Sequence, residues 1–189
     1  MRTATLLMMA LALVPVGTAA QQEGTGAEAR LQAVMDAAAR SEIPLDLLQS
    51  KIAEGRAKGV SMDRIATALE ARLKGLTHAQ EVLSSGGVTA PSEGDLAVTA
   101  DALEAGVSEA ALLQIQNTAP GERRMVATAV LSALVQLGHV PEEALSRVQA
   151  AMERGPDGLA NLRAETAGEL HRRGMRPPGI PGAPGGGEG

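Results

Sequence analysis

Few side chains in this sequence are suited to acid–base or nucleophilic chemistry, and they stand far apart. The three histidines are His78, His139 and His171. A catalytic histidine must lie within hydrogen-bond reach of a substrate, nucleophile or carboxylate. None of the three belongs to a nucleophile elbow, phosphate loop, HExxH motif or calcium loop. We therefore expect structural or solvated roles: His78 on an exposed turn, His139 in the turn at 138–140, and His171 in the cationic last turn of a helix.

Acidic pairs are the other candidates for acid–base chemistry. Glu142 and Glu143 follow a proline at an expected helix start, where the helix dipole stabilises negative charge. Glu165 and Glu169 share a helix face, and Glu169 stands four residues before Arg173, the spacing of a surface ion pair. These are ordinary placements, so the sequence predicts no catalytic residue. The alternative is an enzyme whose acid and base are scattered Glu and His residues that folding brings together.

The arginines and methionines give no stronger signal for a binding centre. The arginines near the C-terminus are expected to form a solvated face. The methionines fall in separate helices at apolar positions, which favours core filling over a copper site. These residues are Arg163, Arg172, Arg173 and Arg176, and Met35, Met62, Met125 and Met152. The sequence therefore predicts no cofactor and no metal site.

Composition excludes several further classes of site. The 189 residues include no cysteine, which removes disulfides, thiolate nucleophiles and zinc–thiolate sites. There is no Phe, Tyr or Trp, so no aromatic ring can stack on bases or hold a cationic ligand. The net charge of −5 disfavours general attraction to nucleic acid. We expect a protein or peptide partner, bound through aliphatic surface, charge and backbone groups.

Residues 1–20 have the features of a secretory signal peptide. Arg2 precedes an uncharged apolar run from Leu6 to Val14, and small residues follow up to Ala20. That run is shorter than the roughly 20 residues of a membrane-spanning helix. We therefore expect cleavage, a secreted or periplasmic location, no stable membrane span afterwards, and a folded domain over residues 21–174.

Residues 25–174 repeat at helical period and are punctuated by glycine. This pattern predicts an all-α fold, a bundle or short array of about seven to eight short helices joined by Gly/Pro turns. Thr25 to Glu28 and Ser92 to Asp95 have the spacing of capping boxes. Cation–glycine pairs are expected helix ends, with the glycine in the left-handed conformation. These glycines are Gly59, Gly75, Gly155 and Gly174.

One helix is expected to be buried on all sides. Residues Met125 to Leu137 carry no charge, and these 13 residues would extend about 20 Å as a helix, too short for a bilayer core. We predict a central helix surrounded by its neighbours. Arg123 and Arg124 precede it at the end where the helix dipole disfavours cations, so we expect them to serve solubility.

A turn pattern recurs four times: a β-branched residue, then Ser or Pro, with Leu or Ile five positions after the first. It is typical of the hydrophobic staple, in which an apolar residue before the helix packs on the first turn. A shift of 64 residues lays the first turn onto the third, which suggests two related halves, 26–84 and 92–174, divided by the loop at 84–91. The four turns begin at Ile43, Val60, Val107 and Val140.

The second of these turns also has the spacing of a DNA-binding motif. Gly55, Gly59 and Ile65 fit it, and the segment resembles the helix-turn-helix of bacterial repressors over about 20 residues. The resemblance would place Ser61 to Arg64 at the start of a recognition helix. Asp63 would then face phosphates, the chain is acidic, and export would separate it from DNA. We interpret the segment as a structural turn, with DNA binding as a lesser alternative.

After Gly174 the chain reads MRPPGIPGAPGGGEG, with glycine at every third position from 179 to 185. So short a collagen-like stretch cannot hold a triple helix, and we predict a disordered tail over 175–189. Because no reactive group is evident, the expected function is that of an exported, non-catalytic helical interaction or scaffold protein.

Overall fold

The computed structural model describes residues 19–119 and 121–175, with side chains from Gly26 onward. Within these residues the chain forms eight α-helices and no strand, so the all-α prediction is confirmed. Most of the expected signal peptide and all but the first residue of the expected tail lie outside the described residues. The helices are α1 (Ala19–Arg40), α2 (Asp46–Ala57), α3 (Met62–Ser85), α4 (Glu93–Glu104), α5 (Glu109–Thr118), α6 (Glu122–Gln136), α7 (Pro141–Glu153) and α8 (Pro156–Arg172).

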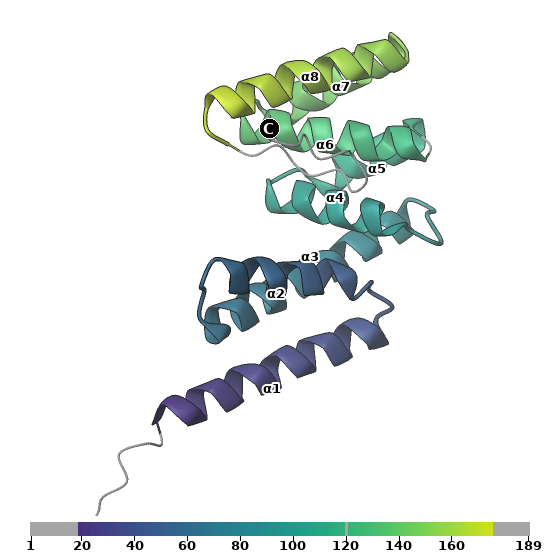
Figure 1. Cartoon of the computed structure of the whole chain (residues 1–189). Coiled ribbons are helices and arrows are strands. Elements are labelled where there is room, and N and C mark those ends of the chain that lie inside the picture. The colour runs from purple at the N-terminus through teal and green to yellow at the C-terminus, as the bar shows by residue number, and fades with distance from the viewer. Residues whose placement is uncertain (1–18, 120, 176–189) are drawn as a thin grey trace, which may run out of the picture.

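The helices stack in layers along one direction (Figure 1). The stack begins with α1 and continues through α2 with α3, then α4 with α5, then α6, and ends with α7 and α8. Each layer contacts the next, so the apolar faces of successive layers pack against one another. None of the described helices is long and apolar enough to cross a membrane.

Two large apolar cores hold the stack together, and a smaller cluster of Ala133, Leu137 and Leu170 joins α6 to α8. An N-terminal core includes Leu48, Leu69 and Leu96, and a C-terminal core includes Leu112 and Leu131. Helix α4 contributes to both, because Leu96 and Ala100 lie in the first and Ala102 in the second. The expected division into two related halves stays a prediction, since packing continues across the loop at 84–91.

Three turns between consecutive helices share one hydrogen-bond pattern. The Ile43, Val60 and Val107 N–H groups each donate to the carbonyl five residues earlier, at 3.0 Å. The residue before each has positive φ: Glu42 (55°), Gly59 (66°) and Gly106 (91°). This is the Schellman C-cap. Positive φ at Gly59, Gly155 and Gly174 confirms three of the four predicted glycine helix ends.

The fourth predicted staple is wrong by one residue. In that turn the backbone N–H of His139 donates to the Leu134 carbonyl at 3.1 Å. His139 therefore occupies the position in the turn that Ile43, Val60 and Val107 occupy in the other three. Val140 becomes the N-cap of α7 and is 53% exposed. Pro141 is the first residue of that helix, where a missing N–H costs no hydrogen bond.

Three further predictions about local structure need correction. Helix α1 begins at Ala19, so Thr25 lies inside it and does not cap it; residues 19–23 are mostly good helix formers. Gly75 lies inside α3, and His78 is therefore on a helix, not on a turn. Burial of Leu69, Leu76 and Leu83 along one face of α3 outweighs the roughly 1 kcal/mol cost of an internal glycine.

The central position predicted for residues 125–137 is confirmed. Helix α6 covers Glu122–Gln136, and every residue from Ala127 to Leu134 is buried. It packs against α4, α5, α7 and α8. A helix buried on all faces needs no polar stripe, which explains its uncharged sequence.

The capping box of α4 is confirmed, and it is joined by an arginine that was expected to serve solubility. The Asp95 N–H donates to Ser92 Oγ, and the Ser92 N–H donates to Asp95 Oδ2, both at 3.1 Å. Arg124 donates to Asp95 Oδ1 from Nη2 at 2.8 Å and from Nε at 3.1 Å. The side chains of Arg124 and Asp95 are only 14% and 9% exposed. Arg124 therefore ties α6 to the start of α4.

Candidate functional site

The three histidines lie in different surroundings. His78 Nε2 on α3 lies 2.8 Å from Glu109 Oε1 on α5, and both side chains are substantially exposed, at 45% and 60%. His139 lies in the turn before α7, as predicted, with Nε2 3.3 Å from Arg147 Nη1. His171 is exposed in the last turn of α8, also as predicted. His78 and His139 thus pair with charged groups that water reaches.

The acidic pairs occupy the positions expected of them. Glu142 and Glu143 lie in the first turn of α7. Glu169 accepts a hydrogen bond from Arg173 Nη2 at 2.6 Å, whereas Glu165 pairs with Arg147 at 3.2 Å. Among the described residues no three His, Asp or Glu side chains gather as a metal site would require.

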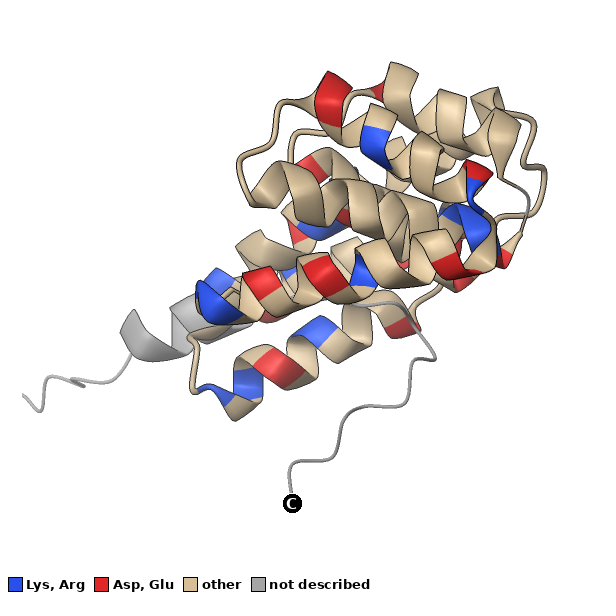
Figure 2. Cartoon of the chain, turned by 90° about the horizontal axis from the view of Figure 1, so that it is seen from above, with Lys and Arg blue, Asp and Glu red and all other residues tan. Residues whose placement is uncertain are grey.

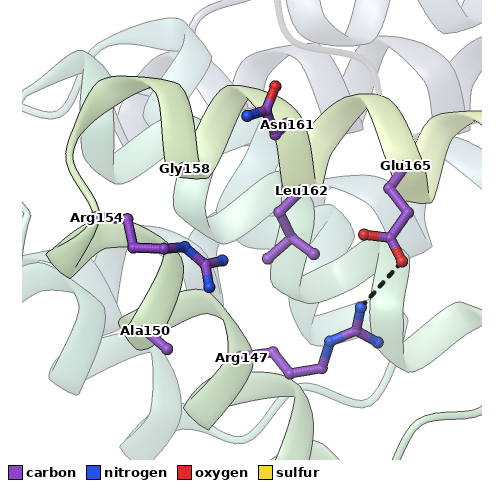
Figure 3. A pocket seen from close by; sticks show the side chains of 7 residues that line it. All are labelled: Arg147, Ala150, Arg154, Gly158, Asn161, Leu162 and Glu165. Atoms are coloured by element: carbon purple, nitrogen blue, oxygen red, sulfur yellow. Dashed lines mark hydrogen bonds and ion pairs between the residues drawn. The ribbon is translucent and has the colours of Figure 1, made fainter.

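A small polar pocket of about 350 Å³ lies between α7 and α8 (Figure 3). Its sides carry Arg147, Arg154 and Glu165, and Leu162 lies among them. The dashed line in Figure 3 is the Arg147–Glu165 ion pair, which joins the two helices across the pocket. Because Arg147 is already paired, Arg154 is the one arginine of this pocket that has no ion pair among the described residues.

A larger groove of about 980 Å³ follows α3 and α4. Its most buried charge is Arg72, whose side chain is 11% exposed. Arg72 Nη1 lies 2.7 Å from Asp101 and 3.5 Å from Glu104, so both carboxylates are already paired across the helix contact. His78 lines the same groove. The ion pairs of Arg72 with Asp101 and Glu104 hold α3 against α4.

The third concave surface, here called the α6/α8 groove, has a mainly apolar lining with fewer charged side chains than the α3/α4 groove. It consists of two adjoining hollows of about 510 and 190 Å³, which share Arg163 and Ala167. One end lies at Glu122 and Pro156, and the other at Ala133 and Leu170, so the two helices run parallel along it. Its principal lining residues are Val126, Ala129, Leu159, Ala160, Ala164 and Ala167.

Two arginines flank this groove. Arg123 Nη2 donates to the Met152 carbonyl at 3.1 Å, and no carboxylate in the described part of the chain lies within ion-pair distance of it or of Arg163. On several other helices of the described chain, blue Lys or Arg residues and red Asp or Glu residues lie near one another (Figure 2). The groove therefore combines a mainly apolar lining with two arginines that a ligand could pair with and one carboxylate, Glu122, at its Pro156 end.

The α6/α8 groove was not recognised from sequence. It depends on two helices, separated by all of α7, lying parallel in space. One local signal existed: Ala160, Ala164 and Ala167 follow helical spacing, yet Ala160 and Ala164 are exposed and Ala167 is half-buried. A line of small apolar residues on a solvent-facing side of a helix leaves room for another chain.

The segment that resembles a helix-turn-helix is packed into the N-terminal layers. A Cβ atom at Gly55 would lie 2.8 Å from Ile65 Cγ1, so glycine allows α2 to approach α3 closely. On α1, Arg30 lies 3.6 Å from Asp63 and donates to Glu70 at 2.8 Å, which lowers the pKa of Glu70. Helix α1 thus contacts α3 near the residues that the resemblance would place at the start of a recognition helix, and the choice between a structural turn and DNA binding stays a prediction.

The sequence matches no protein-family model, and no curated protein or solved structure is detectably similar to it.

Proposed function

We propose that this protein is an exported, non-catalytic helical interaction protein that binds a short segment of another polypeptide in the α6/α8 groove. The observation that carries the proposal is the mainly apolar groove lined by Arg123 and Arg163, neither of which has a carboxylate partner among the described residues. The features expected of a signal peptide in residues 1–20 support export.

The lining of the groove defines the chemistry of the partner. Alanines at positions 160, 164 and 167 leave space above α8 and keep this wall apolar, so the groove accommodates apolar side chains such as proline, alanine or a β-branched residue. A carboxylate on the partner would pair with Arg163 or Arg123, preferably in bidentate fashion. The expected ligand is a short, mainly apolar segment that carries at least one Asp or Glu.

Selection from a displayed random-peptide library tests this proposal. The purified full chain should enrich peptides with small apolar residues and an acidic residue. Ala160 and Ala164 are exposed on α8, so replacing either with Gln places a larger side chain in the groove. Each substitution should weaken binding of the selected peptides at least tenfold. Ala53→Gln, at an exposed position on α2, is the matched control and should leave binding unchanged. Peptides that bind the filled variants as tightly as the parent would contradict the proposal.

Export has its own test, independent of the groove. Expression with the native N-terminus in a bacterial host should give an envelope or secreted product whose intact mass lacks residues 1–20. A cytosolic product of full mass would instead favour an intracellular role and bring DNA binding back into consideration.

A further inference from the structure

The described chain ends at one end of the α6/α8 groove. Met175 packs against Ala133, Leu137 and Leu170, and two of these three, Ala133 and Leu170, also line the groove. The Met175 N–H donates to the Leu170 carbonyl at 2.9 Å, and Gly174 has a φ of 68°. This C-cap ends α8 and leaves Met175 beside the Leu170 end of the groove.

The residues that follow have the length to reach the other end. The groove extends along α8 from Leu170 to Pro156, 14 residues apart, which is about 21 Å at 1.5 Å per residue. An extended polyproline-type chain rises about 3.1 Å per residue, so about seven residues suffice. The sequence continues for 14 residues beyond Met175.

The composition of that segment matches the groove. Residues 177–184 read PPGIPGAP, and all of their side chains are small or apolar. Proline restricts the chain before it binds, which lowers the entropy lost on docking. Glu188 follows four residues later. A tail that fills the groove from the Leu170 end reaches the far end near residue 182. The glycines at 185–187 would let Glu188 turn back to Arg123, which has no carboxylate partner among the described residues.

From this placement, length and charge we infer that residues 177–184 lie in the α6/α8 groove of the same molecule and compete with an external partner. The competition rests on the proposed function; the docking itself does not. The tail is then an intramolecular ligand. A partner can occupy the groove only if it binds tightly enough to displace the tail at the tail's effective concentration.

Alanine methyl groups report the docking directly. Chains labelled with ¹³C-methyl alanine should be compared as the full chain and as a chain ending after Met175. The Ala160 and Ala164 signals should shift on truncation, whereas Ala53, on α2, should not. In the full chain, Ile180→Asp should move both groove signals toward their truncated positions. Unchanged Ala160 and Ala164 signals would overturn the inference, as would shifts that disappear on dilution, because those indicate a second copy.

Competition is measured separately, with the acidic, apolar peptides selected for the groove. The truncated chain should bind them at least tenfold more tightly than the full chain. Methyl shifts without any peptide binding would leave the docking standing and contradict the proposed function. Equal peptide affinities, with unchanged methyl signals, would contradict the docking while the proposed function stands.

Discussion

At the scale of single residues, Arg124 shows how a cation can be stable at a helix N-terminus, where the dipole opposes it. Both oxygens of Asp95 are used: one accepts from Ser92 and the other from Arg124. The carboxylate thus caps α4 and neutralises the arginine at once. Removing Arg124 would leave the Asp95 carboxylate, whose side chain is 9% exposed, without its counter-ion.

We expect Arg124→Ala to lower the free energy of unfolding by about 3 kcal/mol, the usual cost of stranding one member of a buried ion pair. Its neighbour Arg123 provides the control, because it is exposed and makes one hydrogen bond to a backbone carbonyl. Arg123→Ala should cost no more than about 1 kcal/mol. Urea denaturation followed by circular dichroism measures both, and equal losses would show that the Asp95 contact is not structural.

Val140 is the second residue whose role depends on its place in a turn. It has the extended φ and ψ of an N-cap (−61° and 133°) but no side-chain acceptor for the free N–H groups of α7. Val140→Asp supplies that acceptor and a charge favoured by the dipole, so the domain should gain about 1 kcal/mol. Ser108→Ala removes the hydrogen bond from the Ala111 N–H and should lose a similar amount. Thermal melts of the two variants should therefore shift in opposite directions.

At the scale of helices, close approach decides where glycine is needed. A Cβ atom at Gly158 would collide with the Ala151 carbonyl oxygen and lie 2.7 Å from Arg154 Cβ, so α8 could not keep its distance from α7. At Gly168, in the same helix, the nearest atom is Arg172 Nη1 at 3.6 Å, an ordinary contact.

The same substitution should therefore have opposite effects at these two positions. Gly158→Ala forces the helices apart and should destabilise the domain by about 1–3 kcal/mol. Gly168→Ala improves helix propensity and should stabilise it by about 0.5–1 kcal/mol. Chemical denaturation of both variants measures the difference. A loss of stability at Gly168 would mean that α8 has a neighbour there in solution, such as the docked tail.

Local signals explain which elements could be predicted. Glycine after a cation, Ser92 with Asp95, and a long uncharged run each act within a few residues, and they correctly indicated three helix ends, one cap and α6. Gly75 gave the same local signal, but the continuous apolar face of α3 overrides it. Sequence alone could not show that, because the decisive energy comes from contacts with α1 and α4.

The candidate site was harder to predict for the same reason. Arg123 and Arg163 belong to helices separated by α7, and only packing brings them to one groove. The arginine list derived from the sequence contained Arg163 but grouped it with Arg172, Arg173 and Arg176. In the structure Arg173 pairs with Glu169 and donates to the Leu137 carbonyl at 3.0 Å, so it caps helices and does not extend a basic patch.

At the scale of the whole molecule, stability should be greatest in the middle of the stack. Residues Gly94 to Ala100 of α4 and Ala127 to Leu134 of α6 are buried without interruption. On α1, buried positions such as Ala27, Leu31 and Val34 recur only once per turn, because α1 has neighbours on one side. In a layered array the ends can open while the centre stays folded.

Hydrogen exchange should therefore be slowest in α4 and α6 and faster in α1 and α8, when followed by mass spectrometry of peptic fragments. Exchange in α1 as slow as in α6 would indicate that the stack opens only as one unit.

The two walls of the α6/α8 groove should differ in local stability, because α6 is central in the stack and α8 is terminal. A segment that docks there stabilises the wall that opens more readily, so added peptide should slow exchange in α8 and leave α6 almost unchanged.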